Sequence, residues 1–170
     1  MKSHPGGEAH TLRMLELSGL TAGSRVLDLG AGAGEAVRVL RERGFQAKGL
    51  DLAPRSKLVS RGNLLRTGLP DGFFDGVLSQ CAFFQSGDVL SALRESARLL
   101  RPGGILMLSD VFFTSPRPLL EQAGFCLLHQ EDMNEAWKRY LIDAIWRGDF
   151  DCCALPRGKS SYCLLIGRKG

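Results

Sequence analysis

Residues 28–34, Asp28-Leu29-Gly30-Ala31-Gly32-Ala33-Gly34, are the part of this sequence best suited to holding a ligand, and we call them the glycine turn. The glycines permit positive φ angles and leave no Cβ to obstruct a molecule lying against the backbone. Between a strand and a helix, such a turn also presents the amides of the helix N-terminus. Asp28 could meet a ligand ammonium group directly or through water, or could bond the turn amides instead.

Asp51 is the second acidic residue with a candidate role. It follows the glycine turn by one helix and one strand, the interval at which an acidic side chain accepts both ribose hydroxyls of an adenosine. The alternative is an Asp that caps a turn at Pro54. Together, the glycine turn and Asp51 favour a ligand that contains adenosine.

Glu35 narrows the choice of that ligand. In the dinucleotide fingerprint G-x-G-x-x-G the third glycine would stand at this position, so the match to NAD binding is incomplete. A carboxylate in the opening turn of the helix would also oppose a pyrophosphate. A ligand with an ammonium group, a sulfonium and one carboxylate is repelled less by this carboxylate than a pyrophosphate is, and S-adenosylmethionine is such a ligand.

An α/β sheet is needed to position these residues. Strand-like apolar runs alternate with segments that have apolar residues at helical spacing, which predicts a mostly parallel sheet with helices on both faces and an antiparallel last strand. The predicted helices are residues 8–19, 35–43, 88–101, 118–123 and 134–147, and the predicted strands are residues 25–29, 45–52, 74–79, 105–110, 125–128 and 161–167. Pro102-Gly103-Gly104 is expected to end a helix before strand 105–110.

The composition is that of one ordinary globular domain. The chain has 170 residues, of which 44% are hydrophobic and 24% charged, so we expect a single domain over residues 1–170. The net charge of +4 is scattered along the chain, which argues against a nucleic-acid partner. No apolar run suits a membrane span, and the five cysteines lack metal-ligand spacing. These features predict a cytoplasmic protein with reduced thiols and no metal site.

Two further motifs follow the glycine turn and Asp51. They are Gly68-Leu69-Pro70-Asp71-Gly72-Phe73-Phe74-Asp75-Gly76-Val77 and Leu100-Arg101-Pro102-Gly103-Gly104. With all these motifs in order, the chain resembles the class I S-adenosylmethionine-dependent methyltransferases, a Rossmann-like superfamily, and within it the type 11-like enzymes. The resemblance implies S-adenosyl-L-methionine as cofactor. It assigns cofactor binding to Asp28, Gly30, Ala31, Gly32, Asp51, Leu52, Asn63, Leu64 and Gln80.

The chain departs from the family in the segment from Asp51 to Asn63. This segment is shorter than the family's usual second crossover, so we expect its helix to be cut to a turn or two. The resemblance places Asn63-Leu64 where a side chain and a backbone amide read the adenine edge, although the family more often has Asp at the first of these positions. The amide oxygen of Asn63 still provides an acceptor for the adenine amino group.

No catalytic signature is required for methyl transfer, because the protein need only align the acceptor, exclude water and, for a weakly acidic acceptor, remove a proton. By the resemblance, Gln80 and Cys81 lie beside the methyl group. Asp110 is the last residue of the predicted strand 105–110, at the face where catalytic groups gather. Gln80 could position an acceptor and Asp110 could orient it or act as base, whereas a helix cap or a turn bond explains Asp110 equally well. Cys81, with Cys152 and Cys153, could bind a soft acceptor or be incidental.

Three other features have more than one interpretation. Pro5-Gly6-Gly7 with Thr11 resembles a segment that covers the methionine end of the cofactor, or is a frayed terminus. His10 could act as a base but has no visible partner, which favours a structural role. The aromatic side chains of residues 134–147 could line an acceptor pocket or pack in the core.

The sequence therefore predicts an S-adenosylmethionine-dependent methyltransferase with a small-molecule acceptor, and residues 134–160 as an insertion that covers the substrate. A module that binds the cofactor without catalysis is the first alternative. An NAD-dependent oxidoreductase is the second. The acceptor atom and the oligomeric state are left open.

Overall fold

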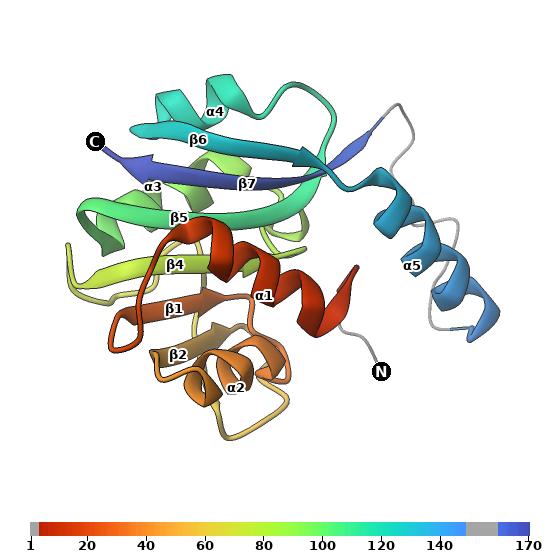
Figure 1. The fold of residues 1–170 in the computed structure, drawn as a ribbon, viewed down its shortest axis with the longest axis horizontal. Helices are drawn as coiled ribbons and strands as arrows, with labels where there is room; N and C mark the ends of the chain where they lie inside the picture. The colour runs from red at the N-terminus through yellow and green to blue at the C-terminus, as the bar shows by residue number, and fades with distance from the viewer. Residues whose placement is uncertain (1–3, 149–159) are drawn as a thin grey trace.

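A twisted sheet organises the protein. The computed structural model describes residues 4–148 and 160–170. These residues form a seven-stranded sheet in the order β3-β2-β1-β4-β5-β7-β6 (Figure 1). The strands are β1 (Arg25–Leu29), β2 (Gln46–Asp51), β3 (Val59–Arg61), β4 (Phe74–Gln80), β5 (Leu100–Phe112), β6 (Phe125–Asp132) and β7 (Ser161–Lys169). The first five pair in parallel, and β7 runs antiparallel to both β5 and β6, which confirms the predicted architecture.

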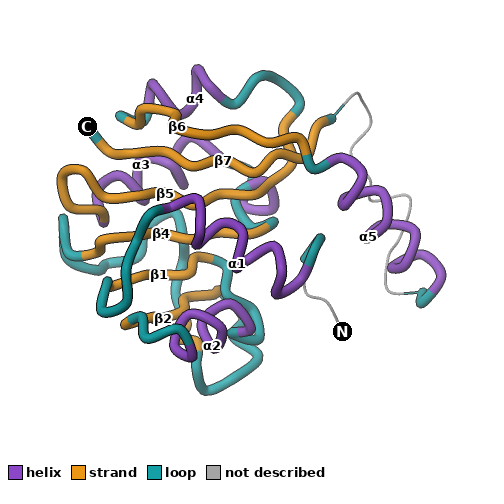
Figure 2. The backbone as a smooth tube through the Cα atoms, in the orientation of Figure 1, coloured by secondary structure: helices purple, strands orange, loops and turns teal. Residues whose placement is uncertain are grey.

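Helices cover both faces of the sheet (Figure 2). They are α1 (Gly7–Ser18), α2 (Glu35–Glu42), α3 (Val89–Leu99) and α4 (Arg117–Gln122), and a fifth helix, α5 (Asn134–Trp146), lies beyond the sheet. Met14 of α1 and Val37 of α2 pack in one apolar cluster with Val26, and Leu93 of α3 packs in the other with Leu27. Val26 and Leu27 point to opposite faces because side chains alternate along a strand. In the part of the chain that the structure describes, no helix is long and apolar enough to span a bilayer.

The strand order reverses between β1 and β4. From β1 the chain proceeds outward to β2 and β3, and then returns to place β4 on the other side of β1. Connections therefore leave the carboxyl ends of β1 and β4 in opposite directions. A crevice between such strand ends is where open α/β sheets bind ligands.

The connection between β2 and β3 differs from the prediction. Residues 52–58 contain no helix, whereas a turn or two of helix was expected. They lead instead into β3, whose Val59 pairs with Gly49 of β2. Because β3 starts beside the end of β2, the chain has little distance to return and needs no crossover helix. Three residues are too few for periodicity to reveal this strand.

The start of β5 also differs from the prediction. The strand begins at Leu100, which pairs with Phe74, and α3 ends at Leu99. Pro102-Gly103-Gly104 therefore does not separate helix from strand but lies within β5, where the register with β4 shifts. Gly103 has a φ of +73°, which fits a local irregularity of this kind.

Helix α5 projects beyond the sheet (Figure 1). It is attached near its N-terminus, where Trp137 stacks on Tyr162 of β7 with ring centroids 5.3 Å apart. The predicted substrate cover, residues 134–160, includes α5. Residues 149–159, with Cys152 and Cys153, lie outside the described residues.

Candidate active site

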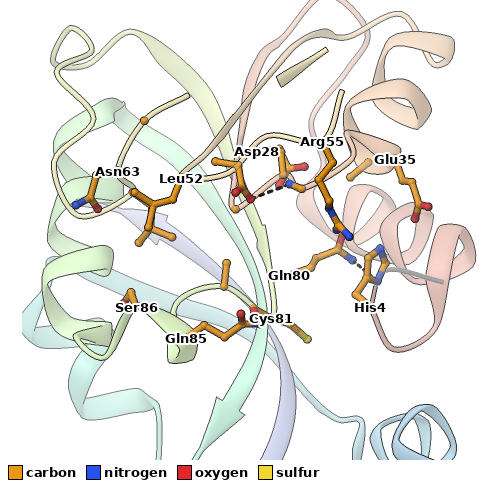
Figure 3. Close-up of a pocket in the computed structure, with 18 of the residues that line it drawn as sticks. His4, Asp28, Glu35, Leu52, Arg55, Asn63, Gln80, Cys81, Gln85 and Ser86 are labelled. Atoms are coloured by element: carbon orange, nitrogen blue, oxygen red, sulfur yellow. Dashed lines mark hydrogen bonds between the residues drawn. The ribbon is translucent and has the colours of Figure 1, made fainter. Parts of the chain in front are cut away.

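A cavity of about 460 Å³ opens where the strand order reverses (Figure 3). Asp28, Asp51 and Gln80 line it from the carboxyl ends of β1, β2 and β4. The cavity lining also includes Gly30, Ala31, Gly32, Leu52, Asn63 and Leu64. The structure therefore brings all the residues expected to bind the cofactor to one cavity.

The glycine turn is shaped by close backbone contacts. Gly30 has a φ of +81°, and a Cβ at this position would lie 2.2 Å from the Cβ of Ala82. The amides of Gly30 and Ala31 donate to the carbonyl of Leu50 at 2.8 and 3.2 Å. These contacts hold the turn between β2 and the segment after β4, and only glycine fits there.

Asp51 is held by both of its carboxylate oxygens. The amide of Gly32 donates to Oδ2 at 2.9 Å, and the amide of Ala53 donates to Oδ1 at 2.8 Å. The second bond is the turn that the sequence offered as the alternative role. Because each oxygen retains a further lone pair, the same carboxylate can also accept the hydroxyls of a ribose.

Asp28 is a buried acid, with only 4% of its surface exposed. Burial and the nearby charge of Asp51 raise its pKa to about 7. Among the described residues no group donates a hydrogen bond to its carboxylate, so the alternative role, bonding to the turn amides, is not what the structure shows. A ligand cation would relieve the repulsion between the two carboxylates.

Three residues form the far side of the cavity. The side-chain oxygen of Asn63 accepts the Leu65 amide at 2.9 Å, which fixes the side chain against its own loop. Leu64 is buried and Leu52 is 65% exposed, and both line the cavity. An apolar surface beside a fixed amide suits a flat heteroaromatic ring.

The side chain of Gln80 is held by hydrogen bonds from the N-terminal segment. Its Oε1 accepts a hydrogen bond from Oγ1 of Thr11 at 3.3 Å, and its Nε2 lies 3.3 Å from Nδ1 of His4. His4 lines the cavity, and α1 begins three residues later, at Gly7. The segment therefore packs over Gln80 from residue 4 onward, which favours the covering role over a frayed terminus. His4 was not among the residues expected from the sequence.

Cys81 lines the cavity but is not poised as a nucleophile. Its thiol donates to the hydroxyl of Tyr162 at 3.3 Å, and burial raises its pKa to about 12. Cys81 also has a φ of +58°. Within the described ranges no cluster of three or more potential ligands could hold a metal.

Asp110 lies outside the cavity lining and is 1% exposed. The amides of Phe83 and Phe84 donate to its Oδ2 at 2.8 and 3.2 Å, and the Val111 amide donates to its Oδ1 at 2.8 Å. Burial raises its pKa to about 6. Asp110 thus holds the segment after β4 in place, and the structure does not bring it to a substrate.

His10 and the aromatic residues lie behind Gln80 and Cys81. His10 is buried, its Nε2 has no hydrogen-bond partner among the described residues, and burial lowers its pKa to about 4. Trp137 stacks with both Tyr140 and Tyr162. These contacts assign Trp137 to packing, which was one of its two expected roles.

Three comparisons with known proteins agree with this geometry. A family model described as "Methyltransferase domain" matches residues 27–108. The chain is 31% identical to the demethylmenaquinone methyltransferase of Tropheryma whipplei (strain Twist), over 65% of this chain and 51% of that protein. It is 28% identical to the ubiquinone biosynthesis O-methyltransferase of Paracidovorax citrulli (strain AAC00-1), over 95% of this chain and 66% of that protein. The chain thus spans only about half to two thirds of these relatives.

The fold is also found among solved structures. Phosphoethanolamine N-methyltransferase 2 of Haemonchus contortus, in complex with S-adenosyl-L-methionine, matches with a TM-score of 0.77 at 18% identity, over 98% of this chain and 53% of that one. The segment matched by the family model carries the glycine turn, Asp51 and Gln80, which are the parts that enclose the cavity. By its sequence motifs and these matches, the segment 27–108 is a methyltransferase domain, similar to those of the class I S-adenosylmethionine-dependent methyltransferases.

Proposed function

We propose that this chain binds S-adenosylmethionine in the cavity at the strand-order reversal and transfers its methyl group to a small molecule. The observation that carries the proposal is a pair of acids, Asp28 in the glycine turn and Asp51 beside it at the end of β2. Two backbone amides hold the Asp51 carboxylate, whose oxygens each retain a lone pair. Asp28 is buried nearby, and no donor to its carboxylate is found in the described part of the chain. Asp51 suits a ribose diol and Asp28 an ammonium group.

In this arrangement the adenosine lies along the β2 side of the cavity, against Asp51, Leu52, Asn63 and Leu64. The amino-acid end lies toward Asp28 and Gln80. Glu35 opens α2 at the cavity wall, and a carboxylate at this helix N-terminus disfavours the pyrophosphate of NAD. The methyl group then faces the space beside Gln80 and Cys81.

Transfer needs alignment more than acid–base chemistry. The acceptor atom forms a bond to the methyl carbon as the carbon–sulfur bond breaks, and the sulfonium becomes the thioether of S-adenosylhomocysteine. A hydroxyl or amine acceptor then loses its proton to solvent. Gln80, held by Thr11 and His4, is rigid enough to position such an acceptor.

The small-molecule acceptor is supported by the relatives, which include a demethylmenaquinone methyltransferase and a ubiquinone biosynthesis O-methyltransferase. It is also supported by the scattered positive charge, which gives no basic stripe for nucleic acid. We place α5 at the acceptor side, as part of the substrate cover over residues 134–160, because Trp137 stacks on the same Tyr162 whose hydroxyl accepts the Cys81 thiol. The described cysteines form no disulfide, which suits a cytoplasmic enzyme.

Calorimetric titration of the protein with S-adenosylmethionine, S-adenosylhomocysteine and NADH tests the cofactor. Asp51→Ala should weaken binding of the first two at least about tenfold, because it removes a carboxylate acceptor from the ribose. The matched control is Glu121→Ala, an exposed acid on α4, which should bind like the wild type. A preference for NADH, or no binding by the wild type, would refute the proposal.

A cofactor-binding module without catalysis is the second candidate. It is favoured by Asp110 and Cys81, two of the three residues considered for catalysis, being engaged in structural hydrogen bonds. Release of S-adenosylhomocysteine in a screen of phenols, carboxylic acids and amines separates the two. Turnover with any acceptor establishes the enzyme, whereas tight binding with no turnover across the screen favours the module.

A further inference from the structure

Among the described residues that line the cavity, Arg55 is the one lysine or arginine. It lies in the loop between β2 and β3, and its backbone amide donates to the carbonyl of Gly32 at 3.0 Å. Its side chain folds back over the glycine turn, with Nη2 only 2.8 Å from where a Cβ on Gly32 would lie. Figure 3 shows Arg55 reaching into the cavity between Asp28 and Glu35 in that view. The absence of a side chain at Gly32 therefore makes room for this guanidinium.

The guanidinium of Arg55 has no hydrogen-bond or ion-pair partner among the described residues. Asp28, on the same cavity, likewise makes no ion pair with it. Opposite charges that face one cavity without neutralising each other form a receptor for a ligand carrying both charges. An α-amino acid group, with its ammonium and carboxylate on one carbon, is such a ligand.

We propose that Arg55 binds the carboxylate of the cofactor's methionine moiety, opposite Asp28, which receives the ammonium. The inference rests on the proposed function and adds a binding residue to it. A guanidinium donates two parallel hydrogen bonds to a carboxylate, which gives orientation as well as affinity. The backbone bond to Gly32 fixes Arg55 to the glycine turn, so the carboxylate subsite moves with the turn that supports the rest of the ligand.

This assignment has a consequence for specificity. An adenosine thioether without the amino-acid group should meet Asp51 and the adenine surface normally but gain nothing from Arg55. Arg55 therefore distinguishes the complete cofactor from nucleosides that share its adenosine half. A solvated arginine with no role in binding would treat both kinds of ligand alike.

The test compares three ligands on wild-type protein and two variants by calorimetry. The ligands are S-adenosylhomocysteine, its decarboxylated analogue, which keeps the ammonium group, and 5′-methylthioadenosine, which lacks both charges. Arg55→Ala should weaken the binding of S-adenosylhomocysteine about tenfold or more, which is the loss of affinity expected for a charge-assisted hydrogen bond. The same variant should bind the other two ligands at least as tightly as the wild type does. Lys57→Ala, which removes an exposed cation from the same loop outside the cavity lining, is the matched control and should change none of the three.

Two results would overturn the role of Arg55. One is unchanged affinity of Arg55→Ala for S-adenosylhomocysteine, and the other is an equal loss for all three ligands, which would indicate a general effect on the site. A wild-type protein that binds none of the three would instead contradict the proposed function itself.

Discussion

Replacing Asp28 by Asn should make the ligand-free protein more stable near pH 8 while weakening its affinity for S-adenosylhomocysteine. Burial and the charge of Asp51 raise the pKa of Asp28 from 3.8 to about 7, a difference of about 3 pH units. Each unit corresponds to about 1.4 kcal/mol, so ionised Asp28 lowers the free energy of unfolding by about 4 kcal/mol at most. The acid is thus kept at a cost to stability.

The pH dependence has a definite sign. Because the pKa is higher in the folded state, the folded protein binds the proton more tightly, and the destabilisation is full above about pH 7. The destabilisation declines as the pH falls toward 3.8. At pH 5 it corresponds to about 1.2 pH units of the pKa difference, or about 1.6 kcal/mol. The gain from Asp28→Asn should therefore be much larger at pH 8 than at pH 5.

Thermal unfolding of both proteins at the two pH values measures this effect. The amide that Asp28→Asn introduces is also buried and loses hydration. We therefore expect the variant to gain about half of the upper limit in free energy of unfolding, roughly 2 kcal/mol at pH 8. For a domain of this size that corresponds to a rise in Tm of roughly 4–8 °C. Glu121→Gln, at an exposed acid, should change Tm little at either pH. A variant that is no more stable than the wild type at pH 8, or one whose gain is the same at pH 5, would refute the reasoning.

Two further predictions concern the walls of the cavity. Gly30→Ala should lower the urea midpoint and abolish S-adenosylhomocysteine binding, because its Cβ would lie 2.2 Å from the Cβ of Ala82. Gly23→Ala is the control, because Gly23 has a similar φ of +90° and a Cβ there would have no atom within 4 Å, so this variant measures backbone strain alone. An equal fall in the urea midpoint in both variants would show that the close approach of Ala82 to Gly30 is unimportant. In peptide mapping after alkylation near pH 8, exposed Cys126 should be modified at least about tenfold faster than Cys81, whose pKa burial raises to about 12. Equal rates would contradict the buried, protonated thiol.

The parts of the site that depend on local backbone were predictable from the sequence. The glycine turn, Asp51 and Gln80 lie at the carboxyl ends of strands, and the parallel sheet brings those ends to one edge. Their residue types and spacing therefore determine where they lie, without knowledge of any side-chain contact.

The parts that depend on tertiary contacts were not predictable. Arg55 enters the cavity because its loop folds back onto Gly32, and no periodicity records this contact. Asp110 has the residue type of a base, but its carboxylate is occupied by amides of the segment after β4. Strand β3 is specified by pairing with β2 rather than by its own three residues.

The connection between β2 and β3 also affects the cooperativity of unfolding. Strand β3 pairs with β2 alone, over three residues, at the edge of the sheet. Such an edge can open while the rest of the sheet stays folded. An adenosine held between Asp51 and Asn63 would bind only the closed edge, and at a ligand concentration one hundred times Kd it would stabilise closure by about 2.7 kcal/mol. Hydrogen exchange at β3 would then slow as the cofactor concentration rises, even though this edge can open without unfolding the rest of the sheet.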